Sequence, residues 1–224
     1  MTFNEFISKL NVNEKRNFDY YSQIRGVQQY KIIFETLSKI DSNITYNDVN
    51  SFIKYDKGIK DILYVYLGSL EEYIKVYIFS KYDFKNDVTH KKNISEYNFF
   101  SQIHALIEPK NVPLDEITEL YKMYALNFKD MVDLLKEKEP NDKFNTDDLY
   151  KIKDLRNDVM HHSPLLFNID GTDKVRETEE LIKILYNTLP LNYPKYLAKD
   201  LNKKTRKYKE KLNNKFYDLL LQLF

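Results

Sequence analysis

The chain has 224 residues and a formal net charge of +1, with 4 Gly, 6 Pro, no Cys and no Trp. Sheet proteins need many tight turns, and phosphate-binding loops need Gly at fixed spacings. The composition therefore argues against a Rossmann fold, a P-loop NTPase and a small β-barrel. The lack of Cys excludes thiolate zinc sites, iron–sulfur clusters and disulfides. An all-α helical bundle is the fold class that remains.

Apolar residues recur at helical spacing along most of the chain. We expect a helical N-terminal region over about residues 2–40, a break at 41–43 and a short helix at about 47–55. Asp56 is expected to cap the next helix, at about 57–82. That helix has the most continuous apolar stripe, so we place it at the centre of the bundle.

The second half of the chain is also predicted to be helical. A polar loop over about 83–94 precedes a short helix near 95–108, and Pro113 opens a helix to about Lys138.

Three further helices follow. The first, at about 147–162, has Asn145 or Thr146 as its cap. The second lies at about 173–188. The third starts near Pro194 and runs to the end of the chain, where a stripe of Leu and Phe must dock on the bundle or on a partner subunit.

We expect one helical domain over residues 1–224. It divides into an N-terminal helical region at about 1–45, a core at about 46–190 and a basic C-terminal helix at about 191–224. No Gly/Ser linker or internal repeat separates these parts.

Charge is distributed unevenly. Residues 195–215 hold nine Lys or Arg against two acids, a net of +7, and residues 114–148 hold ten acids against five Lys, a net of −5. The basic stretch is either a solvated helix face or a strip that binds the RNA backbone. The RNA-binding candidates are Lys203, Lys204, Arg206, Lys207 and Lys209.

No stretch approaches the ~20 apolar residues that span a bilayer. The first residues also lack the basic-then-apolar pattern of a signal peptide. We therefore expect a cytoplasmic protein that has no membrane partner.

The chain has four His: His90, His104, His161 and His162. His90 lies in a polar segment, and His104 is predicted to be a core or boundary residue of a short helix. No His-x-x-x-His or His-Glu-x-x-His spacing occurs, so we expect no metal and no cofactor.

The remaining pair ends a predicted helix that also carries Arg156 and Asn157. At 100° per residue, Arg156, Asn157 and His161 share one side of this helix, and His162 falls on the opposite shoulder. A guanidinium next to an imidazole in the last turn of a helix suits phosphoryl chemistry. RNA supplies its own 2′-hydroxyl nucleophile, so an acid or base and a cation suffice, without a metal.

The pattern Arg156-Asn157-x-x-x-His161 resembles the R-N-x-x-x-H form of the R-x4–6-H signature of HEPN domains. Chance would give this pattern about 0.02 times in a chain of this composition. Glu71 and Lys75 are similar to the Glu-x-x-x-Arg/Lys motif on the central helix of the abortive-infection (Abi-like) branch, with Lys where Arg is commoner. The resemblance covers about residues 20–190 and implies a HEPN-type bundle with additional N- and C-terminal helices.

The resemblance implies a metal-independent endoribonuclease that leaves a 2′,3′-cyclic phosphate and a 5′-hydroxyl. His161 would be the general acid/base, and Arg156 would stabilise the scissile phosphate. Asn157 would orient the substrate or His161. His162 would be either a second catalytic group or a cap of the helix end.

The resemblance also implies partners. Two Arg/His sets would meet across a homodimer interface, and RNA would be the substrate. A role in anti-phage defence or as a toxin would require a neutralising antitoxin, either a protein or a structured RNA.

Glu71 falls within an apolar stripe, where a carboxylate is costly unless it is paired. It either forms an i, i+4 pair with Lys75 or orients Arg156 or His161. Two other function classes stay open for the whole chain. One is a HEPN-like module that binds RNA or protein without cleavage, and the other is a purely structural helical protein.

Overall fold

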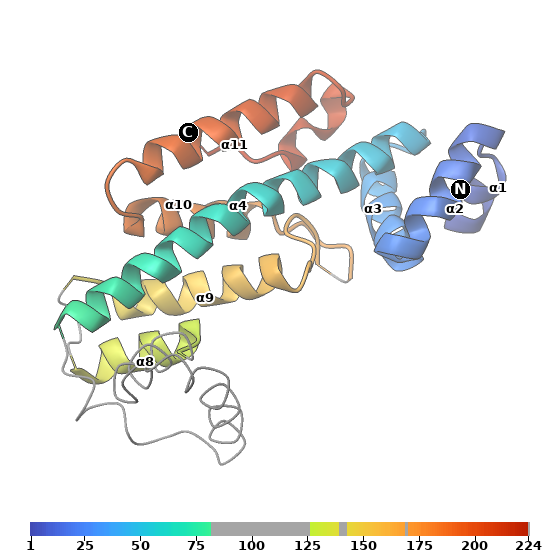
Figure 1. Ribbon diagram of the computed structural model, residues 1–224. Coiled ribbons are helices and arrows are strands. Elements are labelled where there is room, and N and C mark those ends of the chain that lie inside the picture. The colour runs from blue at the N-terminus through green and yellow to red at the C-terminus, as the bar shows by residue number, and fades with distance from the viewer. Residues whose placement is uncertain (82–125, 139–142, 169, 224) are drawn as a thin grey trace, which may run out of the picture. The chain divides into compact units, whose positions relative to one another are not determined.

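The computed structural model describes residues 1–81, 126–138, 143–168 and 170–223 (Figure 1). These stretches are helical and contain no β-strand, only an isolated antiparallel bridge between Phe167 and Asp173. The all-α class is thus confirmed. No helix in these stretches is long and apolar enough to cross a membrane.

Several predicted features lie outside the described residues. They are the loop over 83–94, the helix near 95–108, the helix start at Pro113, and His90 and His104.

The chain clusters into two compact units. The first comprises Met1–Gly68 and Asp154–Phe224, and the second comprises Ser69–Lys153. The single domain that the sequence suggests stays a prediction.

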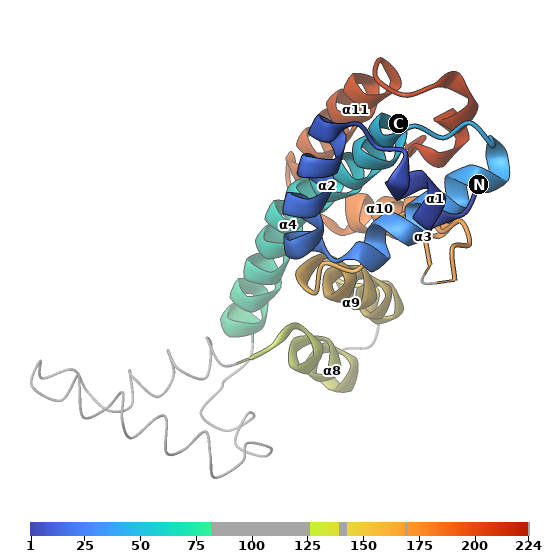
Figure 2. The same cartoon turned by 90° about the vertical axis from the view of Figure 1, so that its right-hand side faces the viewer.

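The N-terminal region forms three helices: α1 (Phe3–Ser8), α2 (Val12–Arg25) and α3 (Val27–Ile40). Capping boxes, in which the N-cap side chain and a Glu three residues later exchange backbone hydrogen bonds, start α1 at Thr2 and α2 at Asn11. Gly26, with φ of 81°, separates α2 from α3. α1 and α2 both pack on α3 (Figure 2).

α4 runs without a break from Tyr46 to Lys81. The prediction of two helices, with Asp56 as the cap of the second, was wrong. Asp56 is only 1% exposed, and it is an internal position of α4, ten residues after the helix begins. Its carboxylate is bound by Lys60, one turn further along α4, and by the distant Leu165 N–H, so it does not compete for the backbone N–H groups of its own helix.

Two helices contribute to the second unit after the gap, α8 (Phe128–Lys138) and the first part of α9 (Thr146–Met160). Of the two predicted caps, Asn145 is the one used. Its Oδ1 accepts hydrogen bonds from the N–H groups of Asp147 and Asp148 at 3.0 and 3.2 Å.

The C-terminal part consists of α10 (Val175–Thr188), α11 (Tyr193–Lys209) and the 3₁₀ helix η2 (Asn214–Leu219). The prediction that the last helix continues to the end of the chain was wrong, because α11 stops at Lys209. The chain then turns back, and η2 packs on α3. Of the terminal apolar stripe, Leu212, Phe216, Leu219 and Leu220 are buried as predicted, and Leu223 is half-buried.

Tyr55 ties this C-terminal return to α4 within the first unit. Its hydroxyl lies 2.8 Å from Thr205 Oγ1 and accepts a hydrogen bond from the Leu221 N–H at 3.1 Å. Its ring centroid lies 5.3 Å from that of Tyr208. Burial raises the pKa of Tyr55 to about 12. Figures 1 and 2 both show α11 alongside the first half of α4.

The change Tyr55→Phe tests this anchor. Removing the hydroxyl leaves the buried Leu221 N–H and the Thr205 hydroxyl without this partner, so we expect a loss of about 1–3 kcal/mol in the free energy of unfolding. Urea denaturation measures it. Tyr196→Phe, at an exposed position on α11, is the matched control and should change little. Equal denaturation midpoints for the two variants would contradict the anchor.

Candidate functional site

The C-terminal end of α9 forms a Schellman motif. The N–H of Ser163 donates to the Asp158 carbonyl at 2.9 Å, and the N–H of His162 donates to the Val159 carbonyl at 3.3 Å. His162 therefore occupies the left-handed position, with φ of 57°. Gly usually fills this position, and another residue there costs roughly 1–2 kcal/mol. Such strain persists only where the surrounding structure holds it.

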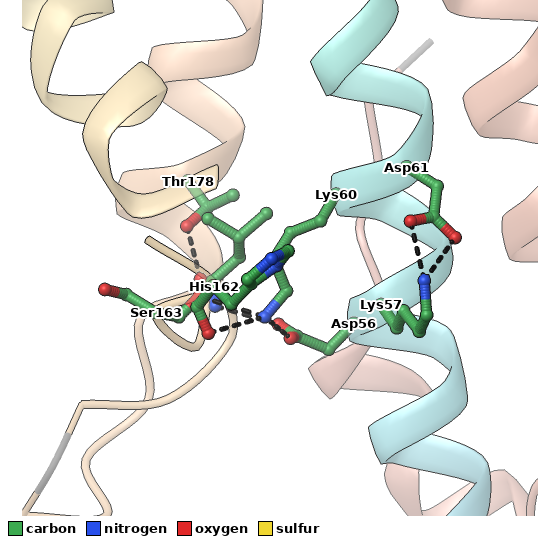
Figure 3. A network of polar contacts seen from close by, with 8 residues as sticks. Asp56, Lys57, Lys60, Asp61, His162, Ser163 and Thr178 are labelled. Atoms are coloured by element: carbon green, nitrogen blue, oxygen red, sulfur yellow. Dashed lines mark hydrogen bonds and ion pairs between the residues drawn. The ribbon is translucent and has the colours of Figure 1, made fainter. Parts of the chain in front are cut away.

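Lys60 of α4 holds this strained turn. Its ammonium donates to the backbone oxygens of His162 at 3.2 Å and Ser163 at 3.0 Å, and it forms an ion pair with Asp56 Oδ2 at 2.5 Å (Figure 3). Three oxygens thus surround a group that has three donors. The Lys60 and Asp56 side chains are only 7% and 2% exposed.

Asp56 extends the network to the segment after the turn. Its Oδ1 accepts a hydrogen bond from the Leu165 N–H at 2.8 Å. The Leu165 carbonyl in turn accepts from Thr178 Oγ1 of α10, at 2.5 Å. The turn that follows α9 is therefore fixed to both α4 and α10, as Figure 3 shows.

The same helix carries an exposed pair for comparison. Lys57 Nζ lies 2.8 Å from Asp61 Oδ1, and the two side chains are 58% and 61% exposed. Water screens this pair, so it contributes at most about 1 kcal/mol. The buried pair differs because either charge would be uncompensated without the other.

The four predicted residues of the motif all lie in the first unit. Arg156 and Asn157 are half-buried on α9, and His161 and His162 are exposed at its end. The His161 N–H still donates to the Asn157 carbonyl, at 2.9 Å, so helical geometry continues to His161. Arg156 and His161 are therefore separated by about 7.5 Å along the helix axis. A long guanidinium side chain can span that separation.

His162 is the residue of the four that borders a cavity. It lines a cavity of about 560 Å³ together with residues of α2, α3 and α4. Arg156, Asn157 and His161 do not line this cavity. His162 lies in the left-handed turn after α9, so helical periodicity does not set its direction, and its opposite-shoulder placement stays a prediction.

Glu71 and Lys75 lie in the second unit and form the predicted i, i+4 ion pair, at 3.1 Å. Their side chains are 18% and 19% exposed, so the pair sits at a boundary of its unit. The alternative role of Glu71, orienting Arg156 or His161, stays a prediction.

The basic residues of α11 divide into two groups. Lys203, Arg206, Lys207 and Lys209 are exposed. Lys204 is half-buried and lies across Gly58 of α4, where a β carbon would approach its Nζ to 2.5 Å. Lys204 is thus less available to a ligand than the sequence suggested.

Sequence reasoning missed the roles of Asp56 and Lys60. The available signal was their i, i+4 spacing inside an apolar stripe, the same pattern that drew attention to Glu71 and Lys75. What the spacing does not reveal is the turn to which Lys60 binds, because that turn lies more than a hundred residues away in the chain.

Within the described stretches, no three His, Asp or Glu side chains are grouped so that they could hold a metal ion. Comparison with protein-family models, curated proteins and solved structures found no match for this chain.

Lys60→Met tests the network. It leaves Asp56 buried without its cation, so we expect the free energy of unfolding to fall by about 3–5 kcal/mol. Lys57→Met, on the same helix, should cost about 1 kcal/mol or less. Adding Asp56→Asn to Lys60→Met should recover part of the loss, because the uncompensated charge is removed. Equal losses for the two lysine variants, measured by urea denaturation, would rule out this role for Lys60.

Proposed function

We propose that this protein is a metal-independent endoribonuclease of the HEPN type. One observation carries the proposal: Arg156 and His161 lie on one short helix whose end is fixed by the buried Lys60–Asp56 network. A rigid support for the reacting groups is what precise positioning requires.

The proposed reaction uses the substrate's own 2′-hydroxyl. His161 accepts the proton of this hydroxyl as the 2′-oxygen bonds to phosphorus. The bond from phosphorus to the 5′-oxygen then breaks, and that oxygen takes a proton from an imidazolium, which His161 of a second copy supplies in a homodimer. Arg156 stabilises the charge that develops on the phosphate oxygens. The products are a 2′,3′-cyclic phosphate and a 5′-hydroxyl.

The cellular role follows from the resemblance alone. An enzyme of this kind acts in bacterial anti-phage defence or as a toxin in the cytoplasm. It is restrained by an antitoxin, which is a protein or a structured RNA.

The exposed face of α11 supports RNA as the substrate. Five exposed cations follow one another along this face. The first four are spaced by three or four residues, and the fifth directly follows the fourth. None of the five forms an ion pair with a described residue. Four residues of helix advance about 6 Å, so the stripe presents a row of charges to a polyanion. We call it the α11 stripe: Lys195, Lys199, Lys203, Arg206 and Lys207.

The α11 stripe also favours the second candidate function, a non-catalytic RNA-binding module. That module would keep the fold and the stripe and would not cleave RNA. Cleavage assays separate the two functions.

The first experiment compares cleavage of a mixed RNA by the wild type and by His161→Ala and Arg156→Ala. We expect losses of about 10²–10⁴-fold for His161→Ala and about 10²–10³-fold for Arg156→Ala. Arg156→Lys should also be impaired, because it keeps the charge but loses the planar fork. Activity should persist in EDTA.

Arg176→Ala, at an exposed position on α10, is the control for loss of an arginine and should retain activity. Circular dichroism checks that each variant is folded. Cleavage that survives His161→Ala and Arg156→Ala, or that EDTA abolishes, would contradict the proposed mechanism. A folded wild type that binds RNA without cutting it would favour the non-catalytic module.

The second experiment measures RNA affinity against salt. Changing Lys203 and Lys207 to Ala should weaken binding to RNA of any sequence. It should also reduce the slope of log affinity against log salt by about 0.7 for each phosphate that the variant no longer neutralises. Changing the exposed Lys54 and Lys183 to Ala, outside α11, is the matched control. Identical slopes for both double variants would exclude the α11 stripe as an RNA-binding surface.

A further inference from the structure

The cavity beside His162 has the size and chemistry of a small-ligand site. Its volume of about 560 Å³ lies within the roughly 300–1,000 Å³ of such pockets. Two buried apolar side chains line it, Ile53 of α4 and Val159 of α9. Its other lining residues, several of them strongly exposed, are Ile24, Gln29, Lys57, Lys60, Asp61, Tyr64 and His162.

The polar groups around this cavity fall into two classes. Lys60 is fully engaged by three oxygens, and Lys57 is paired with Asp61 (Figure 3). The Gln29 amide and the His162 imidazole, by contrast, make no hydrogen bond in the described chain. They are therefore the groups available to a ligand, and between them they can both donate and accept.

The aromatic groups indicate a flat ligand. Tyr64 is 58% exposed although it borders a cavity, and the exposed His162 residue offers a second π face. An apolar floor with aromatic faces accommodates a planar ring, and an amide matches the donor and acceptor edge of a base. The charged rim formed by Lys57 and Asp61 is ill-suited to a lipid tail or an apolar peptide.

The position of the cavity links it to the proposed chemistry. His162 directly follows His161, and consecutive α carbons are about 3.8 Å apart. A base held against His162 would therefore place its ribose and phosphate close to the turn that presents His161. The strained backbone of His162, held by Lys60, fixes the relation between the α carbons of the two histidines.

We propose that this cavity binds the nucleobase of the nucleotide next to the scissile phosphate, and so selects which base the enzyme cuts beside. The assignment of the base to this nucleotide rests on the proposed endoribonuclease function. Tyr64 and His162 stack on the base, and Gln29 reads its hydrogen-bonding edge.

The test is calorimetric titration of the whole protein with the four nucleoside 3′-monophosphates, with ribose 5-phosphate as the baseless probe. At least one nucleotide should bind about tenfold or more tightly than ribose 5-phosphate. Tyr64→Ala should remove about tenfold of that affinity. Ile24→Trp, at a position that is 68% exposed and so tolerates a large ring, should fill the cavity and block binding. Tyr196→Ala is the matched control, because this tyrosine is 57% exposed and lies on α11.

Two results would overturn the proposal: nucleotides that bind no better than ribose 5-phosphate, or unchanged binding in both Tyr64→Ala and Ile24→Trp. RNA cleavage by the same variants separates this failure from failure of the function. If the wild type cleaves RNA and Tyr64→Ala cleaves it with the same base preference and KM, the base pocket is contradicted and the nuclease function stands. If the wild type binds nucleotides but does not cleave RNA, the nuclease function is contradicted and the base pocket stands.

Discussion

The buried ammonium of Lys60 is the constraint on which this part of the structure depends. A cation this deeply buried is tolerated only with a full set of oxygen partners. Asp56 supplies one of them, and the backbone at His162 and Ser163 supplies the other two. Satisfying one side chain thus requires α4 and the end of α9 to stay in a single arrangement.

Three features follow from this requirement. α4 continues through Asp56, because the carboxylate is satisfied by Lys60 and by the Leu165 N–H. The turn that ends α9 is held where the carbonyl groups of His162 and Ser163, just beyond the helix, meet Lys60. His162 can keep a left-handed backbone, which an unsupported turn would give to Gly. The exposed imidazoles are consequently presented from a rigid base.

Much of the fold and part of the site were predictable, for local reasons. The Asn145 cap and the Glu71–Lys75 pair follow from local sequence and helical periodicity, which act over a few residues. The errors lie where distant contacts decide. Asp56 has the chemistry of a cap, but Lys60 and Leu165 bind it. Lys204 belongs to a basic run, but it packs over Gly58. The last helix stops at Lys209, and the chain returns to Tyr55.

By itself, the sequence determined that this protein is helical and that Arg156 projects from a helix, because Gly, Pro and Cys are too scarce for other solutions. It also determined which residues share the face of a helix. Only the tertiary structure decided that a charged pair in the middle of α4 holds the turn after α9, and that a cavity opens beside His162. The physical reason is that burial, and the partners that a buried charge must find, depend on segments a hundred residues apart, which no local pattern encodes.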